Sequence, residues 1–177
     1  MNKLFKSLFL ICLLFSLVFI TTNAQEETDE PKIETKYNDS KNETEVELRQ
    51  VPISVDKSKI ALLSISASFK GKKISKPADV FFIVSVVSVG NYKYPQINNV
   101  TLNSDGKSLG EIIMLNLDQR EFSETEVLET LGTRMKFDIF KKFVVAKKVS
   151  FQIGESLFHV NETQLTLFNE LEKIINP

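Results

Sequence analysis

Residues 80–89 read VFFIVSVVSV, an almost unbroken run of β-branched and aromatic side chains. Such side chains pack well on a pleated surface, and a short apolar run of this kind is typical of a buried strand. Residues 60–69 read IALLSISASF, with apolar side chains at every second position from Leu63 to Phe69 and serines between them. That alternation indicates a strand with one face in the core and one face in water. The sequence therefore predicts a sheet centred on residues 80–89.

Shorter stretches on both sides of this centre also show the patterns of strands. The segment that begins at Thr44 alternates strictly, and Asp105-Gly106 lies between two apolar runs, where a tight hairpin turn needs residues that tolerate a positive φ. Further strands are predicted at residues 100–102, 109–117, 124–131, 134–137, 149–153 and 157–160. We expect an antiparallel sheet of seven to nine strands.

Two helices are predicted near the end of the chain. Residues 139–147 place apolar side chains at helical spacing, and Asp138 is expected to cap their start. For the last helix, Asn161 and Gln164 have the spacing of a capping box. The order strand, helix, hairpin, helix favours an α+β fold, in which an antiparallel sheet, as a sandwich or half-barrel, is covered by two helices.

The first 24 residues have the three parts of a secretory signal peptide. Lys3 and Lys6 form a basic head, Leu8 to Ile20 form an apolar run, and Ala24 is a small residue at the expected cleavage point. The apolar run is shorter than the roughly 20 residues that a membrane-spanning helix needs. We therefore predict a secreted or periplasmic protein with no stable membrane anchor after cleavage.

Removal of residues 1–24 leaves a mature chain without cysteine. The single cysteine, Cys12, lies inside the apolar run. Lipid attachment at Cys12 is the alternative, but Ile11 is larger than the residue that a lipobox places there. A cysteine-free mature chain excludes disulfides, zinc–thiolate sites and cysteine nucleophiles, so its stability must come from an apolar core.

The mature chain is expected to consist of a leader and one domain. Residues 25–43 contain few large apolar groups, so they are predicted to be a disordered acidic leader, and residues 44–177 to form the single α+β domain. The leader is either a plain spacer or an acidic arm that folds over a basic surface. No dense basic stripe is present, which argues against nucleic acid as a partner.

Lysines gather at two places in the predicted domain and form the only candidate binding site that we select. The candidates are Lys70, Lys72, Lys73 and Lys76 in one loop, and Lys141 and Lys142 in the first helix. If the two groups meet in space, they can attract an anionic polymer or a lipid head group. The alternative interpretation is that they are ordinary solvated surface lysines.

No residue is predicted to be catalytic, to bind a cofactor or to bind a metal. The single histidine, His159, has no nucleophile or set of metal ligands beside it in the sequence. The only acidic cluster comprises Asp118, Glu121, Glu124, Glu126 and Glu129. Paired carboxylates can hydrolyse glycosides, but a solvated strand face also accounts for this pattern.

Several landmarks together resemble a loosely defined group of small exported bacterial proteins that have no assigned role. They are Phe69-Lys70-Gly71-Lys72 with Pro77 and Val80, the Asp105-Gly106 turn, IFKKFVVAKKV at residues 139–149, and Gly154 before the closing helix. The resemblance covers roughly residues 60–175. Because these positions concern turns and packing, the resemblance implies a fold and a compartment, and it implies no active site.

Three functions follow as hypotheses from the sequence. The first is an exported, non-catalytic binding or interaction domain, whose partner is a protein, an apolar ligand or an anionic surface. The second is a carrier that holds an apolar ligand in a cavity lined by the sheet, because many phenylalanines remain in the mature chain. The third is a hydrolase that uses carboxylates of the segment from Asp118 to Glu129.

Overall fold

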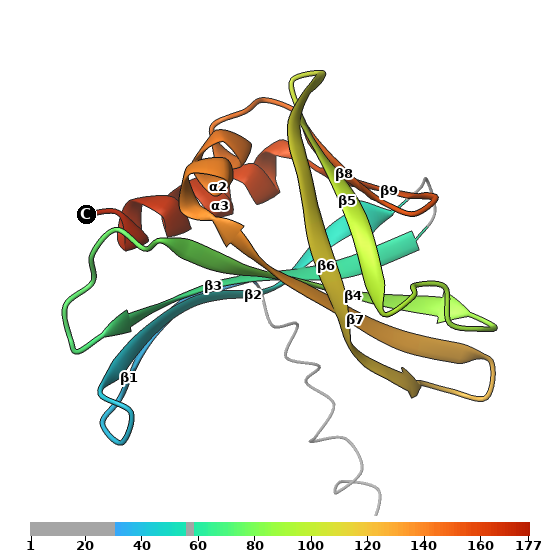
Figure 1. Ribbon diagram of the computed structural model, residues 1–177, viewed down its shortest axis with the longest axis horizontal. Helices are drawn as coiled ribbons and strands as arrows, with labels where there is room; N and C mark the ends of the chain where they lie inside the picture. The colour runs from blue at the N-terminus through green and yellow to red at the C-terminus, as the bar shows by residue number, and fades with distance from the viewer. Residues whose placement is uncertain (1–30, 56–58) are drawn as a thin grey trace, which may run out of the picture. The chain divides into compact units, whose positions relative to one another are not determined.

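Nine antiparallel strands dominate the part of the chain that the structure describes. The structure is a computed structural model that describes residues 31–55 and 59–177 (Figure 1). The predicted signal peptide and residues 25–30 lie outside the described residues. The strands are β1 (Ile33–Asn38), β2 (Glu43–Val55), β3 (Lys59–Lys70), β4 (Asp79–Val89), β5 (Ile97–Ser104), β6 (Lys107–Glu121), β7 (Glu126–Lys136), β8 (Val149–Ile153) and β9 (Ser156–Val160).

Eight of these strands close into a barrel. The strand order is β1-β2-β3-β4-β7-β6-β5-β8-β9, and β9 also pairs with β2. This last pairing joins Ser54 to His159 and Val55 to Phe158. The ring therefore runs from β2 to β9, and β1 is a ninth strand on the edge of β2 outside the ring.

The predicted α+β sandwich or half-barrel is wrong, because the fold is a closed, mostly β barrel with two short helices. Two physical features explain the error. The closing contact joins residues more than a hundred positions apart, and period-two patterns give no information about which distant strands pair. In addition, β6 is 15 residues long, whereas the pattern indicated only its apolar centre at residues 109–117.

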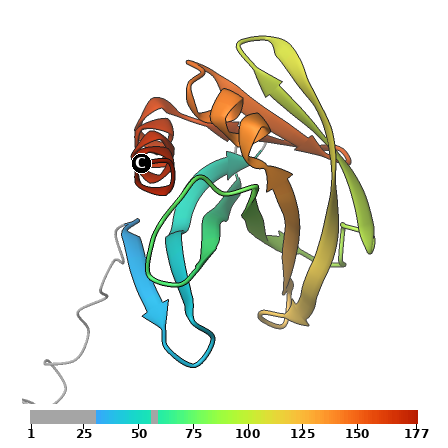
Figure 2. The ribbon, with the colours of Figure 1, turned by 60° about the vertical axis from the view of Figure 1, so that its left-hand side comes forward.

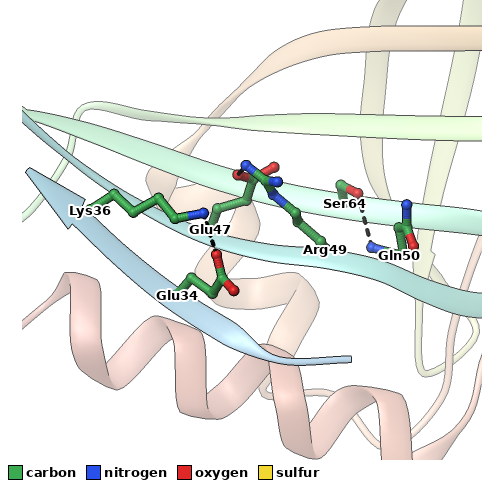
Figure 3. A network of polar contacts seen from close by, with 6 residues as sticks. All are labelled: Glu34, Lys36, Glu47, Arg49, Gln50 and Ser64. Atoms are coloured by element: carbon green, nitrogen blue, oxygen red, sulfur yellow. Dashed lines mark hydrogen bonds and ion pairs between the residues drawn. The ribbon is translucent and has the colours of Figure 1, made fainter. Parts of the chain in front are cut away.

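A bulge in β2 lets one strand serve two neighbours on the same edge. The register with β3 shifts between Leu48 and Val51, and Gln50 has a positive φ of 54°. The Gln50 backbone N–H, which has left the regular ladder, donates to Ser64 Oγ at 3.1 Å (Figure 3). Residues before the bulge pair with β1, and those after it pair with β9.

The first strand lies within the segment that was predicted to be a disordered leader. Residues Ile33–Asn38 pair with β2 from Leu48 back to Glu43, so the folded domain begins before residue 44. The edge strand β1 carries charged side chains on one face: Lys36 Nζ lies 2.5 Å from Glu34 Oε2 (Figure 3). Charged side chains on an edge strand discourage pairing with other chains. The charged side chains also leave β1 with few large apolar residues, so its sequence lacks the clear apolar alternation by which a strand is predicted.

Helix α2 (Phe137–Val144) closes one end of the barrel with aromatic side chains. Its apolar face, Phe137, Phe140, Phe143 and Val144, is buried. The Phe143 ring meets Phe82 of β4 edge to face, with ring centroids 5.8 Å apart. Phe82 also meets Phe151 at 5.4 Å, and Phe151 stacks on Phe158 at 4.7 Å. These rings fill the part of the barrel interior around Phe82.

Helix α2 begins two residues before the predicted start and ends three residues before the predicted end. Its N-cap is Lys136, which makes no side-chain cap, so the predicted capping role of Asp138 is wrong. Asp138 lies instead in the first turn, where its carboxylate contacts Lys76. A further helical turn beyond Val144 would be less amphipathic than α2, because it would begin with Val145, whose apolar side chain is exposed.

Helix α3 (Glu162–Ile175) packs against β2 and against α2 (Figure 2). The predicted capping box is confirmed. Asn161 Oδ1 accepts from the Gln164 backbone N–H at 3.0 Å, and Gln164 Oε1 accepts from the Asn161 N–H at 2.6 Å. Gln164 Nε2 also donates to the Pro52 carbonyl on β2. Gln164 thus satisfies a strand carbonyl on the edge of β2 where the pairing passes from β1 to β9.

Candidate functional site

The six candidate lysines lie at the end of β3, on the loop that follows it and on one helix, all at the same end of β4. We call this group the lysine surface: Lys70, Lys72, Lys73, Lys76, Lys141 and Lys142. The loop is residues 71–78 between β3 and β4, and the helix is α2. The loop ends 59 positions before α2 begins in the sequence.

The start of the loop is fixed to the β1–β2 hairpin. Gly71 ends β3 with a φ of 79°, a conformation that strains residues with a Cβ. Its N–H donates to the Asn42 carbonyl at 2.7 Å, and the Thr44 hydroxyl donates to the Gly71 carbonyl at 2.6 Å. Lys72 lies over the Tyr37 ring, with Nζ 4.9 Å from its centroid. This part of the surface is therefore held in place by backbone and aromatic contacts.

The end of the loop is fixed to α2. Lys76 Nζ lies 3.0 Å from Asp138 Oδ1 and 5.6 Å from the centroid of the Phe137 ring. The Phe137 N–H donates to the Ala78 carbonyl at 3.0 Å, which continues the attachment into the backbone. The structure thus brings part of the loop group and the helix group of lysines together around one carboxylate.

The helix lysines lie near that carboxylate, because Lys141 and Lys142 follow Asp138 by three and four positions on α2. The hydrogen bond from Lys76, and then the charge of Lys76, lower the pKa of Asp138 below its ordinary value of 3.8. The charges of Lys141 and Lys142 lower this pKa further. Because Asp138 is fully exposed, water weakens these effects. Asp138 is nevertheless outnumbered by positive charges.

Five of the six lysines form two groups, one at each end of the loop, rather than a single cluster. Lys70 and Lys72 lie by the β1–β2 hairpin, and Lys76 lies by α2 with Lys141 and Lys142. Within residues 31–55 and 59–177, five of the six have no ion-pair partner: Lys70, Lys72, Lys73, Lys141 and Lys142. Such an arrangement suits an extended partner with diffuse negative charge, because a lysine is a hydrated point charge without the planar fork of arginine.

The five carboxylates of the acidic cluster are divided among three environments. Asp118 faces water and lies 3.6 Å from Arg120 in an exposed ion pair. Glu121, Glu124 and Glu126 line a surface hollow of about 360 Å³ at the opposite end of β4, together with Gly90 and Tyr92. Glu129 turns into the barrel and is fully buried.

Glu129 holds the β4–β5 loop. Its Oε1 accepts from the Tyr94 N–H at 2.9 Å, and its Oε2 accepts from the Lys93 N–H at 3.0 Å. Gln119 Nε2 donates to the same carboxylate at 3.2 Å. A buried carboxylate surrounded by three donors in this way positions the backbone of a loop. The sequence pattern placed Glu129 on a polar strand face and missed this role.

The described part of the chain contains no cluster of metal-ligating side chains and no helix that could span a membrane. No group of three or more histidine, cysteine or acidic side chains that could hold a metal ion occurs in residues 31–55 and 59–177. His159 is exposed on β9, opposite Ser54 and Ser150. Within the same residues, neither helix has the length and hydropathy to span a membrane.

The predicted hairpin turn at Asp105-Gly106 is confirmed, and the structure adds a contact. Asp105 and Gly106 have positive φ values of 49° and 78°. The Asp105 carboxylate accepts from the N–H groups of Lys147 and Lys148, the latter at 2.9 Å. This turn thereby holds the chain that leaves α2. The partner lies 42 residues away, so the sequence pattern carried no signal for the contact.

Comparison of the chain with known protein families, with curated proteins and with solved structures found no match.

Proposed function

We propose that this protein is an exported, non-catalytic binding domain whose lysine surface engages an acidic polypeptide. The observation that carries the proposal is the contact between Lys76 and Asp138, which places one lysine of the loop beside those of α2. The barrel and its aromatic closure support this surface from below, since Phe137 and Phe140 are buried beneath the exposed face of α2. A pre-formed surface loses little conformational entropy on binding.

The chemistry of the surface favours a diffuse acidic partner over a small anion. Its cations are all lysines, spread over a loop and a helix. A small phosphate or carboxylate ligand is usually bound by an arginine fork or by converging backbone N–H groups. Broad attraction of this kind mainly raises the association rate, and it falls steeply as salt is added.

Binding of poly-L-glutamate to residues 25–177, measured at low and high salt, tests the proposal. We expect saturable binding that weakens with salt, and we expect Lys142→Glu to weaken it by about tenfold, because a like charge then faces the polymer. Arg120→Glu is the matched control, since it makes the same change in net charge on an exposed strand remote from the surface. Equal losses in the two variants would show that only net charge matters and would refute the site.

Two further measurements complete the test. Vesicles of phosphatidylcholine with and without phosphatidylglycerol should bind more weakly than poly-L-glutamate; stronger binding to the anionic vesicles would assign the surface to lipid instead. Export itself is tested by the intact mass of protein recovered from the periplasm or medium. We expect a chain that lacks residues 1–24, and a retained Met1 would contradict export with cleavage.

A further inference from the structure

Four aliphatic side chains form a row on the outside of the barrel. We call them the aliphatic row: Ile97, Ile113, Leu115 and Leu117. Their side chains are between 46% and 61% exposed. Ile97 on β5 is directly opposite Leu115 on β6, and the other two are the next outward-facing positions along β6. The four therefore make one continuous apolar surface, unlike the scattered single hydrophobes that are normal on a protein.

The outer face on the other side of the barrel is built differently. There β2 presents Glu47 and Arg49, paired at 2.6 Å, and β3 presents serines such as Ser64 (Figure 3). A solvated barrel strand is expected to alternate apolar inside and polar outside, as β2 does and as β3 does except at Leu62. The aliphatic row breaks this rule on β5 and β6 only along its own length. A contiguous exposed row of this type is a feature of contact surfaces.

Leu117 is fixed in the row by a glycine. A Cβ added to Gly132 on β7 would lie 2.5 Å from Leu117 Cδ1, so the leucine lies flat against the β7 backbone at that point. Gly132 has no positive φ that would itself require glycine. Glycine in the interior of a strand weakens it and commonly marks a close approach. The approach here extends the apolar surface from β6 onto β7.

The charges beside the row are of both signs. A hollow of about 560 Å³ lies where β6 and β7 diverge, and Glu111 and Arg134 are among its lining residues. Neither of them has an ion-pair partner among the described residues, although the Arg134 guanidinium stacks on Phe81, 4.7 Å from the ring centroid. Along β6, Asp118 and Arg120 form another balanced pair.

We propose that two copies of this chain associate through their aliphatic rows about a two-fold axis. In such a contact the same surface of both copies must be complementary to itself. The aliphatic row meets this condition because it lies beside one acidic residue, Glu111, and one basic residue, Arg134. Glu111 of each copy then pairs with Arg134 of the second copy. A surface of one sign would instead favour a partner of opposite charge, as the lysine surface does.

The size of the row indicates how strong this contact is. Four half-exposed aliphatic side chains supply a patch on the order of a few hundred Å², the size of the largest patch on a typical monomer, and less than the roughly 800 Å² per partner of a standard stable interface. The dimer is therefore weak, with a dissociation constant of micromolar order, and Glu111 and Arg134 contribute to its geometry.

Sedimentation of residues 25–177 over about two orders of magnitude in concentration, around the micromolar range, tests the proposal. Residues 31–177 are one compact unit with its own core, so this piece can be studied alone. We expect the mass to rise from that of a monomer to that of a dimer. Leu115→Lys should leave a monomer throughout, because it places a charge at the centre of the row. A wild-type chain that stays monomeric over the whole range would overturn the proposal.

Three variants separate the specific contact from general stickiness. Leu62→Lys replaces an exposed leucine on the outside of β3, 38% exposed, and should dimerise as the wild type does. Glu111→Arg and Arg134→Glu should each weaken the dimer by about tenfold, and the double variant should recover most of that loss. A double variant as weak as either single variant would refute the Glu111–Arg134 arrangement. Equal losses from Leu62→Lys and Leu115→Lys would refute the row.

Discussion

The two ends of the β4–β7 pair are closed by different kinds of interaction and carry opposite charge. Asp79 pairs with Lys136 at one end, and Val89 pairs with Glu126 at the other. At the first end, α2 inserts phenylalanine rings into the barrel and presents lysines to water. At the second end, a loop is held by the buried carboxylate of Glu129, beside a hollow lined by three more glutamates.

The difference shows what each end can tolerate. Aromatic packing depends on shape and area, so the exposed face of α2 can vary in charge without loss of the closure. The polar closure depends on hydrogen bonds between specific partners, so loss of the Glu129 carboxylate weakens it directly. The aromatic end is therefore better suited to carry a charged binding surface.

The largest effect is expected from the aromatic end. Phe143→Ala removes a fully buried ring that packs on Phe82, and it should lower the free energy of unfolding by about 4 kcal/mol. Urea unfolding followed by circular dichroism measures this. Phe143→Leu keeps most of the volume and should cost less than half as much. A loss below about 1 kcal/mol for the alanine variant would show that α2 does not close the barrel.

The polar end should give a slightly smaller but more local effect. Glu129→Ala leaves the N–H groups of Lys93 and Tyr94 without this acceptor and should cost about 3 kcal/mol. Hydrogen exchange should accelerate first at these two amides. Glu129→Gln retains one carbonyl oxygen and is the matched control, with a smaller loss. Unchanged exchange at both amides in the alanine variant would contradict the proposed role of Glu129.

A third change concerns α3, the helix that packs against α2 at the lysine-bearing end of the barrel. Asn161→Ala removes the side-chain cap of α3, which packs against α2, and should lower stability by about 1 kcal/mol. Asn161→Asp retains the acceptor and should be close to neutral. The same urea measurement decides the result. If the alanine variant unfolds at the wild-type urea concentration, the capping hydrogen bond contributes nothing.

The smallest effect concerns the contact between Lys76 and Asp138. Because the pKa of Asp138 is lowered in the folded protein, the stabilisation is complete above its ordinary value of 3.8 and is lost as pH falls through the lower, folded value. Carboxyl NMR signals should place the titration of Asp138 below pH 3.8. Lys76→Met should raise that pKa, and Lys173→Met on α3 should leave it unchanged. An Asp138 that titrates identically in wild type and Lys76→Met would exclude the contact.

Local patterns predicted local structure correctly where a single element decides it. The strand at residues 80–89, the Asp105-Gly106 turn and the Asn161–Gln164 capping box are all present. In each case the decisive interactions lie within a few residues of each other. Strand and cap preferences act at that range, so the sequence contains the relevant signal.

Features that depend on distant contacts were not predictable in this way. Closure of the barrel rests on two residue pairs between β2 and β9, and the attachment of the lysine loop rests on Lys76 and Asp138, 62 residues apart. The lysines themselves could be named from the sequence as a charged cluster, but their arrangement in two groups could not. Glu129 was counted among surface carboxylates because an inward-facing glutamate looks the same in a sequence as an outward-facing one.

The central claim is that the end of the barrel closed by α2 carries the binding surface. Backbone NMR of labelled residues 25–177, titrated with poly-L-glutamate, tests it most directly. The account predicts that the signals which shift belong to residues 70–78 and to the exposed face of α2, while those of residues 90–96 and 121–127 stay in place. Shifts at the glutamate-lined end, or no shifts at either end at low salt, would contradict it.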